Sequence, residues 1–208
     1  MRYTYQDGVK QSKKATPKPL LWLLGLGFVA GIYVVSLLAW PALPISSAEV
    51  QSVTDMVKHN QPDPSHNRLY VPKLGLIVPI GSGENSLTVV KDSGNPIDGG
   101  NYILSGNKLA LGPTPGATAE RSPLYHVERL AAGDDIFIDY QGKRYDYKVD
   151  GQQTVASNDS SFETPTTKPT LTLYTRSDGV LERTRQVIFA HPIGVVTWID
   201  GKAGLKAL

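Results

Sequence analysis

The chain has 208 residues, of which 40% are hydrophobic and 19% charged, a balance that excludes global disorder. It contains no cysteine, which excludes disulfides, thiolate catalysis and thiolate metal sites. The net charge of +2 comes from residues 1–40, which carry five basic side chains and one acid. The rest of the chain is slightly acidic and lacks the basic clustering that nucleic acids require, so we expect no nucleic-acid partner.

The first predicted element is the uncharged run Leu20–Trp40, LLWLLGLGFVAGIYVVSLLAW. As a helix it spans about 31 Å, which matches the hydrocarbon core of a bilayer. A cleaved signal peptide is the alternative, but its apolar stretch is about 7–15 residues long and ends at a small-x-small site. This run is longer and is followed by Pro41 and Pro44, so we favour an uncleaved transmembrane helix.

The basic residues that precede this run predict its orientation. By the positive-inside rule, the tail of residues 1–19 is cytoplasmic and the rest of the chain is extracytoplasmic, as in a single-pass type II protein of the cell membrane. Residues 41–67 are polar and contain several prolines. Within them AEVQSVTDMVKHN predicts a short amphipathic helix and QPDPSHN a linker, so we interpret residues 41–67 as a stalk.

Residues 68–208 read as a domain of short strands. RLYVPKLGLIVPI, NYILSG, LTLYT, RQVIFA and GVVTWID are each typical of strands, and DIFIDYQGKRYDYKVDGQQTV predicts a hairpin that turns at Gln141-Gly142. SPLYHVERL predicts one helical turn with Ser122 as its N-terminal cap. Because no βαβ alternation is present, we predict an all-β, mostly antiparallel small barrel with one or two short helices.

Four segments in order resemble the sortases, membrane-anchored cysteine transpeptidases. YVPKLGLIVPI resembles the opening strand pair of that family, NYILSGNK its Leu-Ser-Gly-His strand end, and SPLYHVERLAAGDDIFIDYQGKRYDYKV its helix and hairpin. LTLYTR followed by RTRQVIFA is similar to its Thr-Leu-x-Thr-Cys strand and the next strand. The resemblance covers about residues 68–199 and implies a sortase-like barrel.

The resemblance also implies which chemistry is missing. In the family a cysteine thiolate attacks the carbonyl of a sorting-signal peptide, a histidine protonates the leaving amine, and an arginine stabilises the oxyanion. The cysteine position is Arg176 here and the histidine position is Asn107, while Arg185 matches the arginine. A guanidinium is not a nucleophile and an amide has no titratable proton to give. We therefore expect a pseudoenzyme that acts as a binding or assembly module.

The alternative is a transpeptidase or hydrolase that uses non-standard residues. Ser177, Thr175 and Ser105 carry hydroxyls near the expected site, and His126 and His191 are candidate bases. A serine nucleophile needs a base within hydrogen-bond reach, and the spacing of these residues promises none.

Charge indicates what such a module binds. Arg176, Arg185 and Lys108 would gather near Asn107, and guanidinium groups recognise carboxylates and phosphates. The sequence thus predicts as ligand a sorting-signal or other carboxylate-ended peptide, or an anionic cell-wall polymer. Alternatively, Arg176 pairs with Asp178 or Glu182 and only fills the end of the barrel. We predict no metal and no cofactor, and an exposed polar loop at ASNDSSFETPTTKPT that walls the groove.

Overall fold

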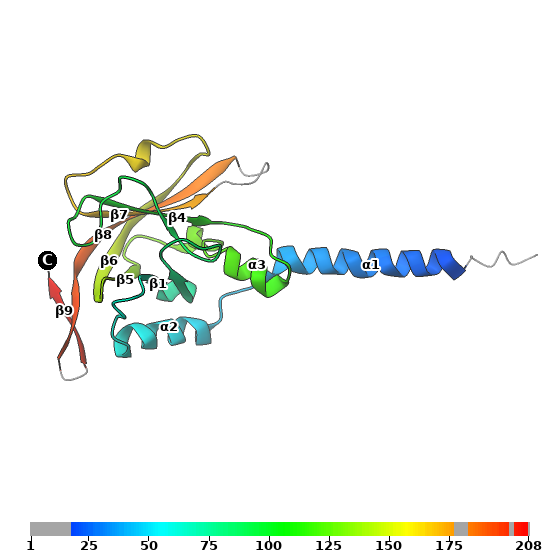
Figure 1. The fold of residues 1–208 in the computed structure, drawn as a ribbon, viewed down its shortest axis with the longest axis horizontal. Helices are drawn as coiled ribbons and strands as arrows, with labels where there is room; N and C mark the ends of the chain where they lie inside the picture. Colours follow the sequence, from blue (N-terminus) through cyan, green and yellow to red (C-terminus); the bar gives the residue numbers. More distant parts are fainter. Residues whose placement is uncertain (1–17, 177–182, 200–201, 208) are drawn as a thin grey trace, which may run out of the picture. The chain divides into compact units, whose positions relative to one another are not determined.

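The computed structural model describes residues 18–176, 183–199 and 202–207. The chain divides into two compact units, residues 1–36 and residues 37–208 (Figure 1). Helix α1, Lys18–Ala39, contains the predicted apolar run and is long and apolar enough to cross a membrane. This first structural element is therefore compatible with a single-pass anchor.

The second unit is built on one sheet, and the predicted small, mainly β barrel is confirmed. Its strands in the described residues follow the order β2-β1-β5-β6-β8-β7-β4-β3, with β9 paired to β8. The two ends of this path meet through a bridge between Ile80 and Leu87, which brings the sheet round on itself. The strands are β1 Arg68–Val71, β2 Leu76–Pro79, β3 Thr88–Val89, β4 Asn101–Asn107, β5 Asp135–Tyr140, β6 Lys143–Ala156, β7 Thr170–Arg176, β8 Thr184–Ile199 and β9 Lys202–Ala207.

The β5–β6 hairpin forms at the predicted turn. Gln141 and Gly142 have φ values of 49° and 76°, the two left-handed positions that a tight hairpin of this twist requires. RQVIFA and GVVTWID, which we predicted as separate strands, form the single strand β8 instead. Pro192 does not end β8. Its partner on β6 is Tyr147, and the pairing of the two strands shifts register between Asp146 and Tyr147, a kind of irregularity at which a sheet accepts proline.

Helix α2, Ser47–His59, confirms the predicted amphipathic helix after the apolar run. Ser46 and Glu49 close a capping box at its start. Val53 and Val57 are buried against Tyr70 of β1, so the helix packs on the outer face of the sheet. This packing ties residues that follow the apolar run directly to the barrel.

Helix α3 was not predicted from the sequence, whereas the helical turn predicted in SPLYHVERL is present as the 3-10 segment η3, Val127–Arg129. Helix α3 is Pro115–Arg121, with Thr114 as its N-terminal cap and Pro115 in its first turn. Ser122, which we expected to start a helix, ends this one: its Oγ donates to the carbonyl of Thr118 at 2.6 Å. The remaining helical turns are the 3-10 segments η1 Trp40–Ala42, η2 Pro72–Leu74, η3 Val127–Arg129 and η4 Ser161–Glu163.

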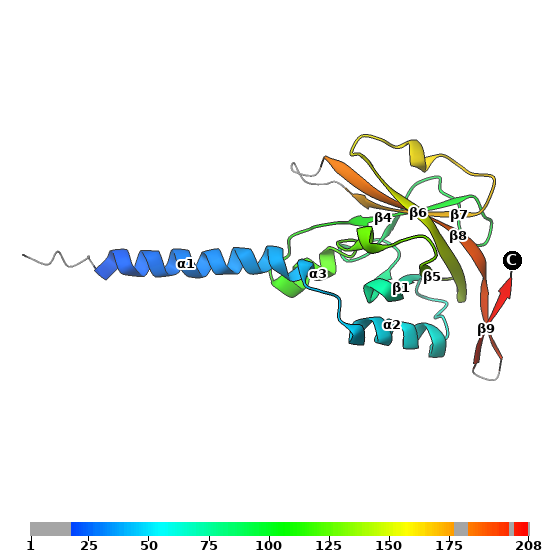
Figure 2. The ribbon, with the colours of Figure 1, turned by 180° about the vertical axis from the view of Figure 1, so that it is seen from behind.

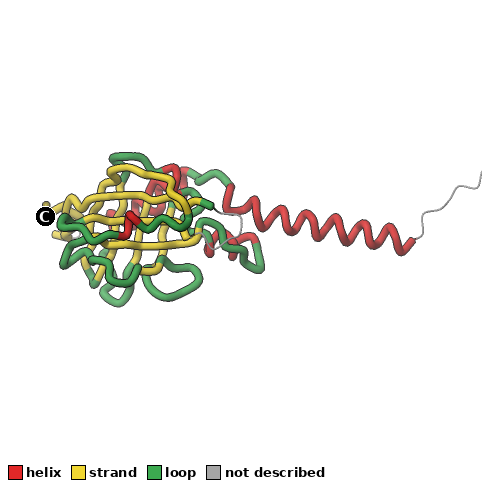
Figure 3. Tube along the Cα trace, turned by 90° about the horizontal axis from the view of Figure 1, so that it is seen from above, coloured by secondary structure: helices red, strands yellow, loops and turns green. Residues whose placement is uncertain are grey.

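The sheet buries apolar side chains on both faces. The main core fills the inside of the barrel, with Leu104, Leu173 and Ile188 at its centre. A smaller cluster lies on the other face of β4, β7 and β8, where Ile103, Tyr174 and Val187 pack under Phe162. Phe162 belongs to η4 in the long β6–β7 connection, which runs back over this face (Figures 2 and 3).

Candidate functional site

The site is set up by the parallel pairing of β4 and β7. The register of the two strands places Asn107 opposite Arg176, at the tip of each strand. Nε of Arg176 donates a hydrogen bond of 3.1 Å to Oδ1 of Asn107, and Nη1 donates one of 2.9 Å to Oγ1 of Thr88 on β3. The structure therefore brings together two of the residues predicted from the sequence and adds Thr88, which no sequence motif marks.

Asn107 connects this strand tip to helix α3. Its Nδ2 donates to the main-chain carbonyl of Arg121 at 3.2 Å. This bond directs Oδ1 toward the guanidinium of Arg176, so the amide accepts from one arginine while its other end holds the end of the helix. The pair is a fixed polar contact with an acceptor and donors, and neither member is a nucleophile.

A surface hollow of about 340 Å³, which we call the tip hollow, lies at this contact. It is lined by Glu84, Asn107, Ala110, Arg121 and Arg176. Nη1 of Arg121 donates to the carbonyl of Leu111 at 3.1 Å, and Nη2 is paired with Oε2 of Glu84. Arg121 and Glu84 were missed by the sequence reasoning, although the Thr-Pro capping signal of α3 was present to be found.

Arg185 and Lys108 lie outside the residues that line the tip hollow. The guanidinium of Arg185 stacks on the ring of Tyr174, 5.5 Å from its centroid, and its buried Nε has no hydrogen-bond partner among the described residues. Lys108 follows Asn107 and is half-buried. Burial raises the pKa of Tyr174, and Glu163 adds to the effect, so the phenol beneath Arg185 is neutral.

The β6–β7 connection covers the face between Arg185 and the start of β4. Nδ2 of Asn101 donates to the carbonyls of Phe162 and Thr164, both at 3.1 Å, and Oγ1 of Thr172 donates to Oδ1 of Asn101 at 2.7 Å. Phe162 packs edge-on against Tyr174 at 4.9 Å and is buried. The expectation of an exposed loop is therefore wrong at Phe162, because this ring and the amide of Asn101 hold the segment to the sheet.

The hydroxyls considered as nucleophiles serve main-chain groups. Oγ1 of Thr175 accepts from the amide of Gln186 at 2.9 Å, and Oγ of Ser105 donates to the carbonyl of Thr88 at 3.4 Å. Ser177, Asp178 and Glu182 lie outside the described residues.

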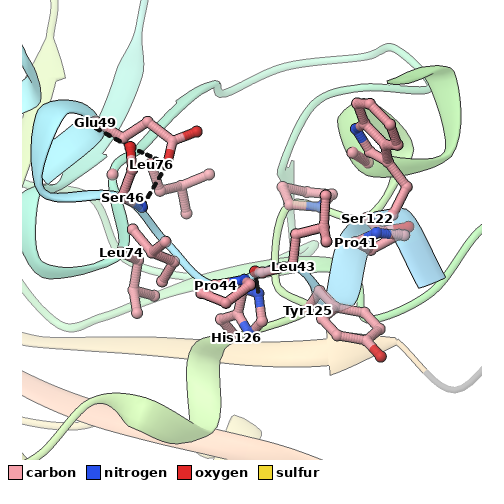
Figure 4. A pocket seen from close by; sticks show the side chains of 15 residues that line it. Pro41, Leu43, Pro44, Ser46, Glu49, Leu74, Leu76, Ser122, Tyr125 and His126 are labelled. Atoms are coloured by element: carbon pink, nitrogen blue, oxygen red, sulfur yellow. Dashed lines mark hydrogen bonds between the residues drawn. The ribbon is translucent and has the colours of Figure 1, made fainter. Parts of the chain in front are cut away.

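The candidate bases are engaged elsewhere. Nε2 of His126 is 3.2 Å from the carbonyl of Leu43, in a separate hollow of about 500 Å³ beside residues 40–46 (Figure 4). His191 Nδ1 contacts Asp150 at 2.6 Å. His66, on an exposed turn, contacts both Ser65 and Asp63 through the same nitrogen, Nδ1. A serine–histidine–aspartate triad needs the two partners on opposite ring nitrogens, so these three residues do not form one.

Acidic side chains do not assemble an ion site in the described ranges: no group of three or more His, Cys, Asp and Glu side chains there is placed to hold a metal ion. Asp134, for example, pairs through Oδ2 with Nζ of Lys73 at 2.7 Å. The chemistry of the strand tip is therefore that of guanidinium, amide and hydroxyl groups.

Comparison with known proteins adds the family. No curated protein matches the sequence. Among solved structures, sortase C of Streptococcus pneumoniae superposes with a TM-score of 0.53 at 15% identity, covering 74% of this chain and 93% of that one. A lid mutant of sortase A from Corynebacterium diphtheriae gives 0.51 at 18% identity, over 84% and 96%.

Sortase A of Listeria monocytogenes also has this fold, with a TM-score of 0.51 at 17% identity over 67% of this chain and 90% of that one. These likenesses concern the fold. The family model for the sortase domain matches residues 69–193, more than half of the chain and the same stretch that folds into the barrel. The chain therefore belongs to the sortase family.

Proposed function

We propose that this chain is a membrane-anchored sortase-fold protein that binds peptides or anionic polymers at the cell surface and does not transpeptidate. The observation that carries the proposal is the bond of 3.1 Å from Arg176 to Asn107. These two residues occupy the positions where the family resemblance expects a thiolate and a general acid. Here they hold each other, and neither provides a nucleophile or a transferable proton.

The proposed ligand follows from the charge at the strand tips. Arg176 and Asn107 line the tip hollow, whose size falls at the lower end of the range for small-molecule sites. Arg185 and Lys108 complete the set of residues that we propose for ligand binding, Arg185 from the neighbouring strand and Lys108 from the residue after β4. A carboxylate or phosphate group suits guanidinium donors in both charge and geometry.

The proposed location is the outer side of the cell membrane. Helix α1 supplies the anchor, and the basic residues before it favour a cytoplasmic N-terminus with the barrel outside. Protease applied to intact spheroplasts is then expected to remove the barrel. Protection in intact spheroplasts followed by digestion after lysis would reverse the orientation.

The alternative, a sortase-type transpeptidase or hydrolase with non-standard residues, has one observation in its favour. The hydroxyl of Thr88 lies 2.9 Å from the guanidinium of Arg176, and a nearby cation favours the ionised form of a hydroxyl. Among the described residues, however, no histidine has a hydrogen bond to Thr88 (the partners recorded for His126 and His191 are Leu43 and Asp150). The binding module is therefore the better supported function.

Binding is tested with the full chain in detergent micelles and a fluorescently labelled sorting-signal-type peptide. We expect saturable binding that weakens between 50 and 500 mM salt, about the range over which screening sets in. Arg176→Gln is expected to weaken it roughly tenfold or more, because a charge-assisted contact contributes about 1.5–3 kcal/mol. Arg129→Gln, at an exposed arginine away from the strand tips, is the matched control. Equal binding by wild type and Arg176→Gln would remove Arg176 from the site.

A further inference from the structure

The tip hollow already holds a carboxylate supplied by the chain itself. Glu84 stands in the loop between β2 and β3, and its Oε2 pairs with Nη2 of Arg121 at the end of α3. The Glu84 side chain is 75% exposed and that of Arg121 is 31% exposed. The arginine is anchored by its second contact, to the carbonyl of Leu111, while the glutamate reaches it from an exposed loop.

This ion pair also borders two hollows. A second one, of about 490 Å³, which we call the loop hollow, is lined by Pro79, residues 82–86, Pro113, Ala117 and Arg121. Glu84 and Arg121 line both hollows. The ion pair therefore borders both hollows.

We propose that Arg121 and Arg176 together bind the carboxylate of a peptide, and that Glu84 is a built-in competitor that occupies Arg121 until the ligand displaces it. This inference rests on the proposed binding function and extends it by naming the second arginine, the ligand group and the internal competitor. The residues that precede the carboxylate then lie along the loop hollow, against Pro79, Pro113 and Ala117.

A peptide carboxylate fits better than a polymer phosphate because Glu84 is itself a carboxylate on a peptide segment. The site therefore accommodates this group in the geometry of a guanidinium–carboxylate pair. The lining of the loop hollow also favours a peptide, because it includes two prolines and an alanine that can pack against peptide side chains. Displacement of Glu84 releases the guanidinium of Arg121 to the incoming anion, in a hollow that Arg176 also lines.

Displacement is inexpensive because the pair is exposed. Solvent-exposed ion pairs contribute little to stability, so the loss of the Glu84 contact is offset by an equivalent contact to the ligand. Glu84 then lowers the affinity for every carboxylate. An isolated carboxylate binds weakly, whereas a peptide that also fills the loop hollow gains further contacts and binds more tightly.

The test uses the full chain in detergent micelles and a labelled alanine pentapeptide with a free C-terminal carboxylate, followed by fluorescence anisotropy. Glu84→Gln is expected to tighten binding roughly two- to fivefold, since it removes the competing charge. Glu128→Gln is the matched control, because it removes the same charge at an exposed position that lines neither hollow. A gain in affinity is not produced by misfolding, so this variant carries the test.

Two further arms complete the experiment. Arg121→Gln is expected to weaken binding of the pentapeptide about tenfold. A pentapeptide that carries a C-terminal amide in place of the carboxylate is expected to bind the wild-type chain about tenfold more weakly as well. Inorganic phosphate and acetate are then compared for their ability to displace the bound pentapeptide. Displacement by phosphate that equals or exceeds displacement by acetate would overturn the choice of carboxylate. An effect of Glu84→Gln no larger than that of Glu128→Gln would overturn the internal competitor.

The outcome separates this inference from the proposed function. If the pentapeptide binds and Arg176→Gln weakens it, while Glu84→Gln and Arg121→Gln do not alter affinity, the inference fails and the binding function stands. If neither the pentapeptide nor a sorting-signal-type peptide binds the wild-type chain, the proposed function fails and the inference fails with it.

Discussion

Replacement of Arg144 by methionine is expected to remove a buried ion pair between β5 and β6, together with the hydrogen bonds that hold helix α2 to the barrel. The Arg144 side chain is fully buried, and its Nε and Nη2 donate to the two carboxylate oxygens of Asp139 at 2.6 and 2.7 Å. Its Nη1 donates to the carbonyls of Val57 and Asn60 at the end of α2. The guanidinium also stacks over Tyr70 and Trp198, 4.9 and 5.3 Å from their ring centroids.

The magnitude follows from the group that Arg144→Met leaves behind. Methionine fills part of the volume but leaves the Asp139 carboxylate buried without its cation, which costs about 3–5 kcal/mol. With a urea m-value of about 2 kcal/mol per molar, this loss lowers the unfolding midpoint by about 2 M. Unfolding of the full chain in detergent, followed by circular dichroism in the β-sheet region, measures it.

Two controls decide whether the stranded charge is the cause. Lys143→Met removes an exposed cation from the neighbouring position of β6 and is expected to change stability by less than about 0.5 kcal/mol. The double variant Asp139→Asn with Arg144→Met removes the carboxylate as well and is expected to recover much of the loss. A loss under about 1 kcal/mol for Arg144→Met alone would show that the Asp139 carboxylate is not left buried and unpaired, because such a carboxylate is costly.

Three further predictions concern the barrel. The Asp146 pKa is raised to about 6 by burial and then by Asp135, with Lys148 opposing. Because that value exceeds the unfolded value of about 3.9, the contribution of Asp146 to stability is present below about pH 4 and is lost as pH rises through 6. Asp146→Asn is therefore expected to flatten this decline. In denaturant melts from pH 4 to 8, the variant is expected to be more stable than the wild type at pH 7 by roughly 1–2 kcal/mol after solvent screening. Phe162→Ala is expected to cost about 3 kcal/mol and to speed proteolysis in the β6–β7 connection, since the ring packs on Tyr174; unchanged proteolysis would contradict the packing. Gly106→Ala is expected to cost about 1–3 kcal/mol in the same melts, because its methyl would lie 2.5 Å from Leu87; a neutral effect would show that Leu87 moves aside freely.

The parts of the fold that were predicted correctly are those with local signals. The long uncharged run, the Gln141-Gly142 turn and the alternation of Ile136 and Ile138 each determine a local element, and the structure contains all three. Helix α3 was missed because PGATAER is short and has little apolar periodicity, so only its Thr114-Pro115 start marks it. The two halves of β8 looked like separate strands because Pro192 stands between them, and only the pairing with β6 shows the strand to be continuous.

The candidate site was predicted as far as the strand order allows. The resemblance placed Asn107 and Arg176 at neighbouring strand tips, and the β4–β7 register puts them opposite each other. Arg121 and Glu84 could not be found in this way, because their pairing depends on where α3 and the β2–β3 loop meet, 37 residues apart in the sequence. The burial of Phe162 was missed for the same reason: its neighbours on the other strands decide it, and its own segment is polar.

The most direct test of the account follows a sorting-signal-type peptide through the reaction that the sortase fold suggests. The full chain in detergent is incubated with the peptide and an amine acceptor. The masses of the peptide and of the protein are then measured over time by mass spectrometry. If the chain is a binding module, the peptide binds, is recovered uncleaved and leaves no acyl group on the protein. Cleaved or transferred peptide that survives Arg176→Ala and disappears with Ser177→Ala would contradict it and show an enzyme with rearranged machinery.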